Sequence, residues 1–450
     1  MKDYLNRQRA YFNQDVTRDY TFRKQQLKKL YTAIKMYESL IKEALYKDLH
    51  KSSFEAYATE IGFTLHSIRK TQKHLKKWMQ LRKEKTPYYH LFTKSYIKPE
   101  PLGQVLIIGP FNYPFHLVIE PLIGAIAAGN TVVIKPSEYT TNTEQIIKQM
   151  IEETFDPEYI RVVTGGKDVT SELIKLPFDH IFFTGSTQVG KIIYQEAAKN
   201  LVPVTLELGG KSPVIIDKTA NLKVAANRIV FGKFINAGQT CIAPDYIYID
   251  ESIKEEFIPL LKDAIDAFYP EIDDSYGKIV NVKHYNRLIN LIDQNKVIYG
   301  NVQDANAHKI SPTIMDNVSF NDAIMQEEIF GPILPMITFK TIDEVIDKLK
   351  TLDKPLALYL FTSNAAVEYD VFHKLSFGSG AINDTITQVA THYLPFGGVG
   401  ASGIGSYHGK HSFETFSHHK TYIKKTTKYD SKLAYPPYKN KEKLIKRVLK

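Results

Sequence analysis

The sequence is poor in cysteine and contains no long uninterrupted apolar run. Cys241 is the one cysteine among 450 residues, so an intrachain disulfide is impossible and a reducing compartment is expected. The most apolar stretch, residues 117–128, is interrupted by Glu120 and Pro121, and it is shorter than the ~20 residues of a membrane-spanning helix. Residues 1–20 lack the apolar segment of a signal peptide. These absences together predict a cytoplasmic protein.

Other absences exclude further classes of protein. The chain has no internal repeat of fixed period, no low-complexity tract and no Gly/Ser linker. Apolar residues make up 43% and charged residues 24%, which is ordinary for a globular protein and excludes a disordered or collagen-like chain. At ~150 residues per domain, the length predicts about three domains.

Positive charge is concentrated at the C-terminus. The net charge is +9, and residues 424–450 contain ten Lys or Arg against only Asp430 and Glu442. The rest of the chain is therefore nearly neutral. A tail of this kind is typical of a solvated terminus, and the alternative is peripheral contact with an anionic membrane surface. Nucleic-acid binding is not expected, because there is no basic domain with groove-reading or stacking motifs.

The order of elements predicts an α/β fold. Residues 24–77 carry apolar positions at helical spacing, and after Pro87 short β-branched runs alternate with amphipathic segments such as 141–154 and 188–200. This alternation favours parallel sheets with right-handed crossovers. The predicted strands are Val105–Gly109, Thr131–Lys135, Tyr159–Val163, His180–Thr184, Val204–Leu208, Val214–Asp217, Tyr246–Asp250 and Ala357–Phe361.

Two glycine motifs resemble phosphate-binding loops. Residues 398–403 match the dinucleotide fingerprint but follow no apolar strand, so we interpret them as a turn. At Gly185 and Ser186 a predicted strand leads into a helix, whose free N–H groups suit a dinucleotide pyrophosphate. The alternative is an ordinary turn in which Ser186 or Thr187 caps the helix.

Polar residues at predicted strand ends and turns are candidates for chemistry. Cys241, in a polar turn, is a candidate nucleophile; the alternative is a buried small hydrophobic residue. Glu207, in an apolar strand, is a candidate base whose pKa burial would raise; the alternative is an ion pair with Lys211. The Asn112 amide is placed to donate to an oxyanion or to shape a turn.

A second pair of polar residues suits a nucleotide. Lys135 and Glu138 follow the end of the strand 131–135, where open α/β sheets bind their ligands. Both residues are therefore placed to contact a ribose.

Several segments match the motifs of one known family. They are Gly109-Pro-Phe-Asn-Tyr-Pro, Lys135-Pro-Ser-Glu, Phe183-Thr-Gly-Ser, Leu206-Glu-Leu-Gly-Gly-Lys-Ser-Pro213, Gly238-Gln-Thr-Cys and Glu328-Ile-Phe-Gly-Pro332. On these segments the chain resembles the aldehyde dehydrogenase superfamily, from about residue 5 to about residue 425. The segment 238–246 and the run from Leu394 to Ser417 are similar to the class 3, fatty-aldehyde branch.

The resemblance implies a mechanism. Cys241 would attack the aldehyde, Asn112 and the backbone N–H of Cys241 would hold the oxyanion, and Glu207 would activate water to hydrolyse the thioester. Tyr113 and Ile242 would line the substrate pocket. No metal is implied.

It also implies how the cofactor is held. Lys135 and Glu138 would bind the adenosine ribose, Ser186 would meet the pyrophosphate after Gly185, Glu328 would bind the nicotinamide ribose, and Phe330 would pack near the ring. NAD is expected because Glu138 would repel a 2′-phosphate, although the class 3 branch also takes NADP.

The resemblance further implies a Rossmann-like dinucleotide-binding domain, an α/β catalytic domain and a small β oligomerisation element in a homodimer. We assign the first to residues 1–86 and 101–207, the second to 208–394, the element to 87–100 and 395–430, and the basic tail to 431–450. The predicted function is NAD(P)-dependent oxidation of medium- or long-chain apolar, or aromatic, aldehydes. The alternatives are a CoA-acylating aldehyde dehydrogenase and a catalytically idle membrane-surface binding protein. A cysteine protease ranks last, because no histidine has a diagnostic spacing from Cys241.

Overall fold

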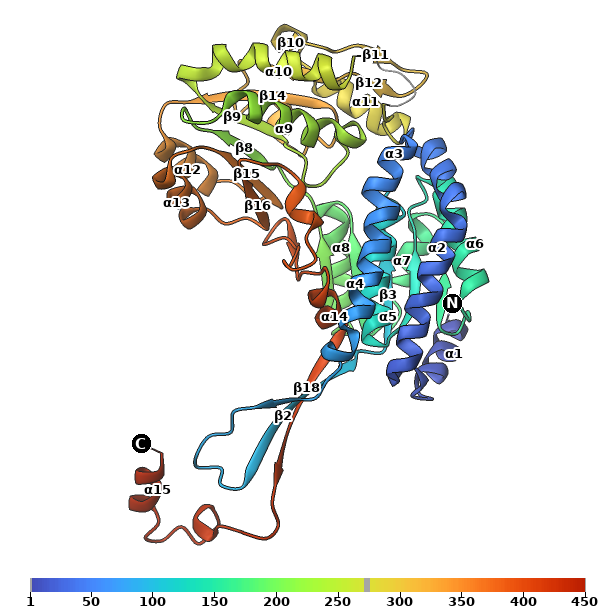
Figure 1. The fold of residues 1–450 in the computed structure, drawn as a ribbon, viewed down its shortest axis with the longest axis vertical. Coiled ribbons are helices and arrows are strands. Elements are labelled where there is room, and N and C mark those ends of the chain that lie inside the picture. Colours follow the sequence, from blue (N-terminus) through green and yellow to red (C-terminus); the bar gives the residue numbers. More distant parts are fainter. Residues whose placement is uncertain (1, 271–275, 450) are drawn as a thin grey trace.

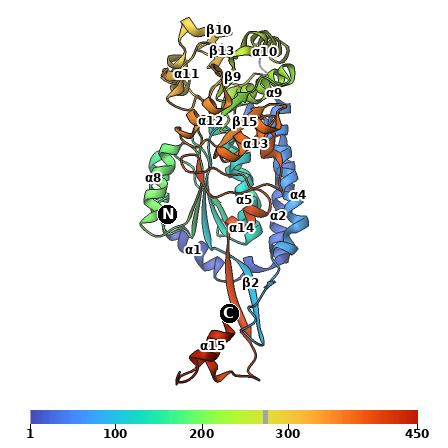
Figure 2. The same cartoon turned by 90° about the vertical axis from the view of Figure 1, so that its left-hand side faces the viewer.

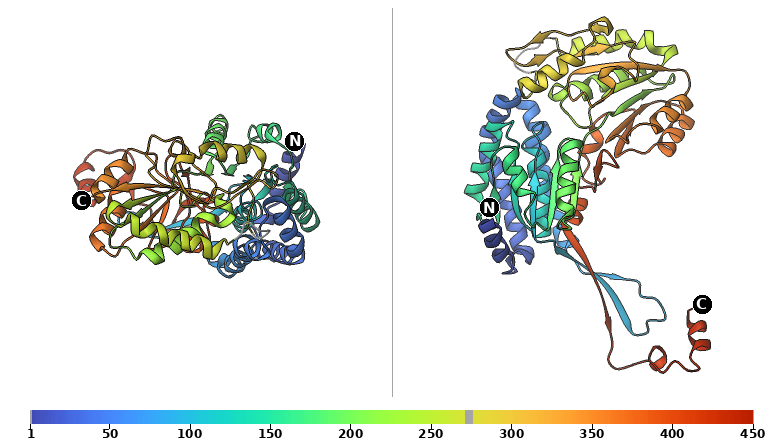
Figure 3. Two further views of the ribbon diagram at one scale, coloured as in Figure 1. Left: turned by 90° about the horizontal axis from the view of Figure 1, so that it is seen from above. Right: turned by 180° about the vertical axis from the view of Figure 1, so that it is seen from behind.

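The computed structural model describes residues 2–270 and 276–449 and contains two large sheets and a long β ribbon (Figure 1). The sheets lie one above the other, and the ribbon extends from the lower sheet away from both, as the view from behind also shows (Figure 3).

The lower sheet has the strand order β17-β7-β6-β3-β4-β5. All neighbours are parallel except β17, which pairs antiparallel with β7. The strands are β3 (Gln104–Ile108), β4 (Thr131–Lys135), β5 (Ile160–Val162), β6 (His180–Thr184), β7 (Val204–Glu207) and β17 (Gly403–Ile404). The order of the strands reverses at β3, because β4 and β5 are added on one side of it and β6 and β7 on the other. The sheet is therefore doubly wound, and such sheets bind ligands at the carboxyl ends of the strands beside that switch point.

Helices cover both faces of this sheet because its strands are apolar on both faces. Along β3, Val105 and Ile107 pack with helices α2, α4, α5 and α6, whereas Leu106 and Ile108 pack against α1, α7 and α8. The helices are α1 (Lys2–Phe12), α2 (Tyr20–Leu49), α3 (Ser53–Ala56), α4 (Gly62–Trp78), α5 (His116–Ala128), α6 (Thr141–Thr154), α7 (Lys167–Leu173) and α8 (Thr187–Ala198).

The upper sheet has the order β10-β13-β14-β9-β8-β15-β16 and is parallel except at β10. Its strands are β8 (Pro213–Ile216), β9 (Tyr246–Asp250), β10 (Val297–Tyr299), β13 (Thr313–Met315), β14 (Ile333–Phe339), β15 (Ala357–Phe361) and β16 (Ser379–Ile382). One face packs against α9 (Leu222–Phe234) and α10 (Lys254–Phe268). The other packs against α11 (Val282–Leu291), α12 (Ile342–Lys350) and α13 (Ala365–Lys374). A short hairpin, β11 (Gln303–Asp304) and β12 (Lys309–Ile310), lies outside this sheet.

The ribbon joins distant parts of the chain. β2 (Thr93–Pro101) pairs antiparallel with β18 (Ser417–Lys425) along its whole length, and β1 (Arg82–Glu84) adds a short third strand. α14 (Lys410–Thr415) precedes β18, and the basic tail after it contains the short exposed helix α15 (Glu442–Val448) (Figure 2). Membrane contact through this tail stays a prediction.

The predicted α/β fold with its parallel sheets is confirmed, and all eight predicted strands are present. The domain boundaries stay a prediction. Within the described residues, no helix is both long enough and apolar enough to cross a membrane.

Candidate active site

The strand ends of the lower sheet bring several predicted residues to one edge. Asn112 follows β3, Lys135 ends β4, Ser186 follows β6 and Glu207 ends β7. Because these strands are parallel neighbours, their carboxyl ends share this edge. The Gly185 N–H donates to the Glu207 carbonyl oxygen at 3.0 Å and joins two of these ends directly.

Cys241 lies in a tight turn between α9 and β9. The preceding turn, Ile235–Gly238, has left-handed backbone at Asn236 (φ +54°), Ala237 (φ +51°) and Gly238 (φ +75°). A Cβ at Gly238 would lie 2.3 Å from the carbonyl oxygen of Gly331, so only glycine fits there. This close approach brings the motif that contains Cys241 against the motif that contains Glu328 and Phe330.

The Cys241 thiol is held in its neutral form. Burial, with the nearby carboxylates of Glu328 and Glu207, raises the pKa of Cys241 to about 12. Hydrogen bonds from the backbone N–H groups of Cys241 and Ile242 act in the opposite direction. The thiol therefore needs a base or an added positive charge before it can react as a thiolate.

Glu207 is a buried carboxyl group with no partner. The residue is 2% exposed, and neither carboxyl oxygen has a hydrogen-bond partner among the described residues. Burial raises the pKa of Glu207 well above its ordinary value. The ion pair with Lys211 that we considered is not formed, because the Lys211 ammonium binds Asp245 at 2.5 Å.

The Asn112 loop is fixed by a buried ion pair that the sequence did not reveal. The carbonyl oxygen of Asn112 accepts hydrogen bonds from Lys51 Nζ (2.9 Å) and Asn236 Nδ2 (2.8 Å). Lys51 pairs with Glu60 at 2.5 Å, and both side chains are fully buried. Glu60 in turn accepts the backbone N–H groups of Phe115 (2.9 Å) and His116 (3.1 Å). The pair thus holds both ends of the segment 112–116.

The two predicted pocket residues lie on either side of Cys241. The Tyr113 hydroxyl is 2.6 Å from Thr240 Oγ1, and its ring lies 3.9 Å from the Lys51 ammonium. Ile242 is buried, and its carbonyl oxygen accepts the Tyr359 hydroxyl at 2.6 Å. Sequence reasoning missed Lys51, Glu60 and Tyr359, because none of them belongs to a motif or a strand end.

Residues predicted to hold a dinucleotide form two groups. At the end of β4, Lys135 is buried and its ammonium lies 3.3 Å from a carboxylate oxygen of Glu138, which is partly exposed. At the start of α8, Ser186 caps the helix by accepting the Val189 N–H at 3.4 Å. The capping alternative for Ser186 is therefore observed, and the first turn of α8 still presents its positive dipole end.

The second group surrounds Glu328. Its carboxylate accepts the Gly210 N–H and lies so close to Gly209 that a Cβ there would be 2.0 Å away. Burial and Asp245 raise the pKa of Glu328 to about 8. Phe330 has a left-handed backbone (φ +49°), and its ring packs against Phe111.

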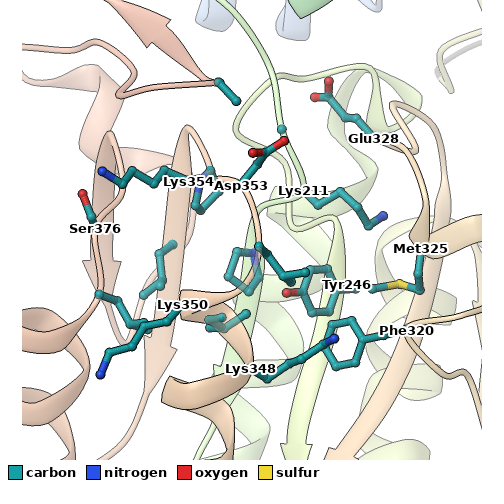
Figure 4. A pocket seen from close by; sticks show the side chains of 18 of the residues that line it. Lys211, Tyr246, Phe320, Met325, Glu328, Lys348, Lys350, Asp353, Lys354 and Ser376 are labelled. Carbon is teal, nitrogen blue, oxygen red and sulfur yellow. The ribbon is translucent and has the colours of Figure 1, made fainter.

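A surface pocket of about 630 Å³ is lined by Glu328, Lys211, Lys348 and Lys354 (Figure 4). It meets the predicted dinucleotide residues only at Glu328, because Lys135, Glu138, Ser186 and Phe330 do not line it. Among residues 2–270 and 276–449, no cluster of His, Cys, Asp or Glu is arranged to hold a metal ion.

Comparison with known proteins agrees with this arrangement. The model of the aldehyde dehydrogenase family matches residues 8–422. The chain belongs to the aldehyde dehydrogenase family. It is 57% identical over 447 residues to 4,4′-diaponeurosporen-aldehyde dehydrogenase of Staphylococcus aureus, covering 98% of this chain and 97% of that protein. It is 45% identical to the dimeric NADP-preferring aldehyde dehydrogenase of Canis lupus familiaris, and the match covers 97% of this chain and 98% of that protein.

A solved structure extends the likeness to the whole fold. The solved structure of the substrate-bound state of Staphylococcus aureus AldH is 56% identical in sequence to this chain and has a TM-score of 0.98. The superposition covers 100% of this chain and 99% of that one. The resemblance predicted from the motifs is therefore confirmed. The protein is an NAD(P)-dependent aldehyde dehydrogenase.

Proposed function

We propose that this aldehyde dehydrogenase oxidises medium- or long-chain apolar aldehydes, or aromatic aldehydes, to carboxylic acids through a thioester on Cys241. The unpaired, buried carboxyl group of Glu207 near the Cys241 thiol is the observation that supports this most strongly. A buried base of this kind is suited to accept a proton from water.

Addition to the aldehyde is the first step. The thiol of Cys241 gives its proton to water as its sulfur bonds to the carbonyl carbon, which turns the carbonyl oxygen into an oxyanion. The Asn112 side-chain amide and the Cys241 N–H donate to that oxygen. The Lys51 and Asn236 bonds to the Asn112 carbonyl keep the loop in place for this.

Oxidation follows at the same carbon. A bound NAD or NADP would supply the hydride acceptor, so that loss of hydride from the thiohemiacetal carbon would leave a thioester on Cys241. Lys135 and Glu138 would hold its adenosine ribose, Gly185 and Ser186 at the start of α8 would meet its pyrophosphate, and Glu328 and Phe330 would hold its nicotinamide end. The half-exposed Glu138 carboxylate favours NAD over NADP by repelling a 2′-phosphate.

Hydrolysis completes the cycle. Glu207 accepts a proton from water, the resulting hydroxide attacks the thioester carbon, and the C–S bond breaks to release the acid and restore the thiol. The net reaction consumes aldehyde, oxidised cofactor and water, and yields acid, reduced cofactor and protons.

Apolar surroundings support the substrate class. Cys241 packs against the buried core, and the rings of Tyr359 and Tyr407 lie close enough for the thiol to raise their pKa values. The relative from Staphylococcus aureus is named for the aldehyde of 4,4′-diaponeurosporene.

The test is turnover of a panel of aldehydes from propanal to hexadecanal, with benzaldehyde, by wild type, Cys241→Ala and Glu207→Gln. We expect wild-type turnover that rises with chain length, none in Cys241→Ala, and in Glu207→Gln one burst of reduced cofactor equal to the enzyme before the reaction stalls. Continued turnover by Cys241→Ala would contradict the proposal.

The same assay with added CoA separates the acylating alternative. Free acid as the product in the presence of CoA supports hydrolysis, whereas acyl-CoA supports the alternative. Absence of turnover with every aldehyde and either cofactor would favour the binding-protein alternative.

A further inference from the structure

A second cavity lies beside α4, where the ribbon leaves the lower sheet. Its volume is about 490 Å³, and it is bounded by α4, α14, the start of the ribbon and residues 392–393. None of the residues assigned above to the thiol, the oxyanion or the dinucleotide lines it.

Fixed positive charge dominates this cavity. Lys70, Lys77, Arg82 and Lys410 line it, and Glu414 is the acidic residue among its lining residues. Glu414 is already paired with Lys410 at 2.8 Å. In the part of the chain that the structure describes, Lys70, Lys77 and Arg82 have no carboxylate partner. The cavity therefore has uncompensated positive charge that an anion would neutralise.

A buried histidine closes one wall of the cavity. His392 is 8% exposed and lines the cavity, but its ring stacks on His66 and both ring nitrogens are enclosed by the protein. Burial lowers the pKa of His392 to about 4, so the ring is neutral and adds no charge to the cavity.

The remaining wall is aromatic. Trp78 stacks on His74 at 6.0 Å and packs against Phe413 at 5.9 Å between ring centroids, and all three line the cavity. Such a wall provides flat apolar surface beside the cations. The basic tail of the chain is a poor occupant, because it has the same sign of charge as the cavity.

We propose that this cavity binds an organic anion, a carboxylate or phosphate ester with an apolar body, between the Trp78–Phe413 wall and the cations Lys77 and Arg82. The charged group would meet Lys77 and Arg82, and the body would lie on the aromatic wall. This site is separate from the oxidation chemistry.

The chain provides its own probe. Trp78 is the single tryptophan, so a change in tryptophan fluorescence reports on this cavity alone. The full-length protein is titrated with octanoate, with 1-octanol, which has the body without the charge, and with inorganic phosphate, which has the charge without the body. Calorimetry of the same titrations gives the stoichiometry.

We expect saturable binding of octanoate, and binding at least about tenfold weaker for octanol and for phosphate, since each loses one part of the site. In the double variant Lys77→Gln/Arg82→Gln, octanoate should also bind at least about tenfold more weakly. The matched control Lys76→Gln/Lys83→Gln removes exposed cations from adjacent positions that do not line the cavity, and should leave binding unchanged.

Three outcomes would overturn the proposal. They are no change in Trp78 fluorescence with octanoate, equal binding of octanol and octanoate, and equal loss in the test and control double variants. Circular dichroism of each variant verifies that it is folded.

Discussion

Glu207, Glu328 and Cys241 are three acids whose pKa values are raised, and only the thiol is affected by the other two. Burial is the larger cause for each, and the two carboxyl groups add to the shift at the thiol. A negative charge nearby disfavours the thiolate, so neutralising a neighbour must lower the pKa of the thiol.

This gives a prediction about thiol reactivity. In Glu328→Gln without cofactor, iodoacetamide should alkylate Cys241 roughly threefold faster at pH 8, corresponding to about half a pKa unit. Because the pKa of Cys241 is raised, the rate should rise with pH in both proteins. Mass spectrometry gives an unambiguous readout, since the chain has no other cysteine.

Glu327→Gln is the matched control for that experiment. Glu327 is the exposed neighbour, and it pairs with Arg287 rather than acting on the thiol. Its variant should react like the wild type. An unchanged alkylation rate in Glu328→Gln would show that the Glu328 carboxylate does not act on the thiol.

The Lys51–Glu60 pair is a positioning device for Asn112, not a group that touches the substrate. Lys51→Met leaves a buried, unpaired Glu60, which should cost about 3–5 kcal/mol of unfolding free energy. The kcat should fall more than KM changes, because Asn112, the proposed oxyanion donor, is displaced. Lys51→Met/Glu60→Gln should recover part of the stability but not the kcat, since neither replacement restores the ammonium bond to Asn112.

The exposed pair Glu43–Lys47 on α2 provides the comparison. Its two charges lie 2.6 Å apart in solvent, so Lys47→Met should cost less than about 1 kcal/mol. Urea denaturation and steady-state kinetics measure both quantities. Equal effects of the two lysine substitutions would contradict the positioning role of Lys51.

At the scale of elements, the sequence predicts strands well where they are apolar and continuous. β3, β4, β6 and β9 are buried at every position, and their pattern is local. β14 was not predicted because Pro335 interrupts it, and proline is unusual inside a central strand. β16 was not predicted because its residues, Ser379–Ile382, are small and only half buried.

The same contrast explains which site residues could be found. Asn112 and Glu207 stand at strand ends, and parallel strands bring their carboxyl ends together whatever the details of packing. Lys51 and Glu60 lie around the short helix α3, before the first strand of the lower sheet, and meet the Asn112 loop only through tertiary packing. No local sequence pattern predicts that contact.

Helix α5 contains a buried acid, Glu120, whose titration predicts how the stability of the fold depends on pH. Burial raises the pKa of Glu120 to about 7, and one carboxyl oxygen accepts the Ser67 hydroxyl at 2.6 Å. Between pH 4.5 and 7 the unfolded chain ionises this group while the folded protein keeps its proton, so stability falls as pH rises through that range.

Glu120→Gln removes this titration. At pH 8 the variant should be more stable than the wild type by up to about 3 kcal/mol, and near pH 4 the difference should vanish. Urea denaturation across that range measures it. A difference that does not grow between pH 4 and 8 would show that Glu120 is not the group responsible.

At the scale of the whole molecule, the ribbon has no core of its own. Most of β18 is exposed, including Tyr422 (42%) and Ile423 (61%), and its outer edge pairs with no strand in the described residues. β18 is a mostly polar strand, but its unpaired backbone edge is a template for pairing with another chain, and Tyr422 and Ile423 add apolar surface to it. The ribbon therefore supports the predicted homodimer, with the partner covering β18.

Ile423→Asp tests this assembly. A buried charge at the centre of a dimer contact should shift the protein from dimer to monomer in sedimentation velocity, because its desolvation is not compensated. Lys424→Asp places the same charge one position along, on the opposite face of the strand, and should affect assembly less. The proposed site residues come from one chain, so monomeric Ile423→Asp should still oxidise aldehydes. A wild type that sediments as a monomer, or a variant that remains dimeric, would mean that β18 is not the contact.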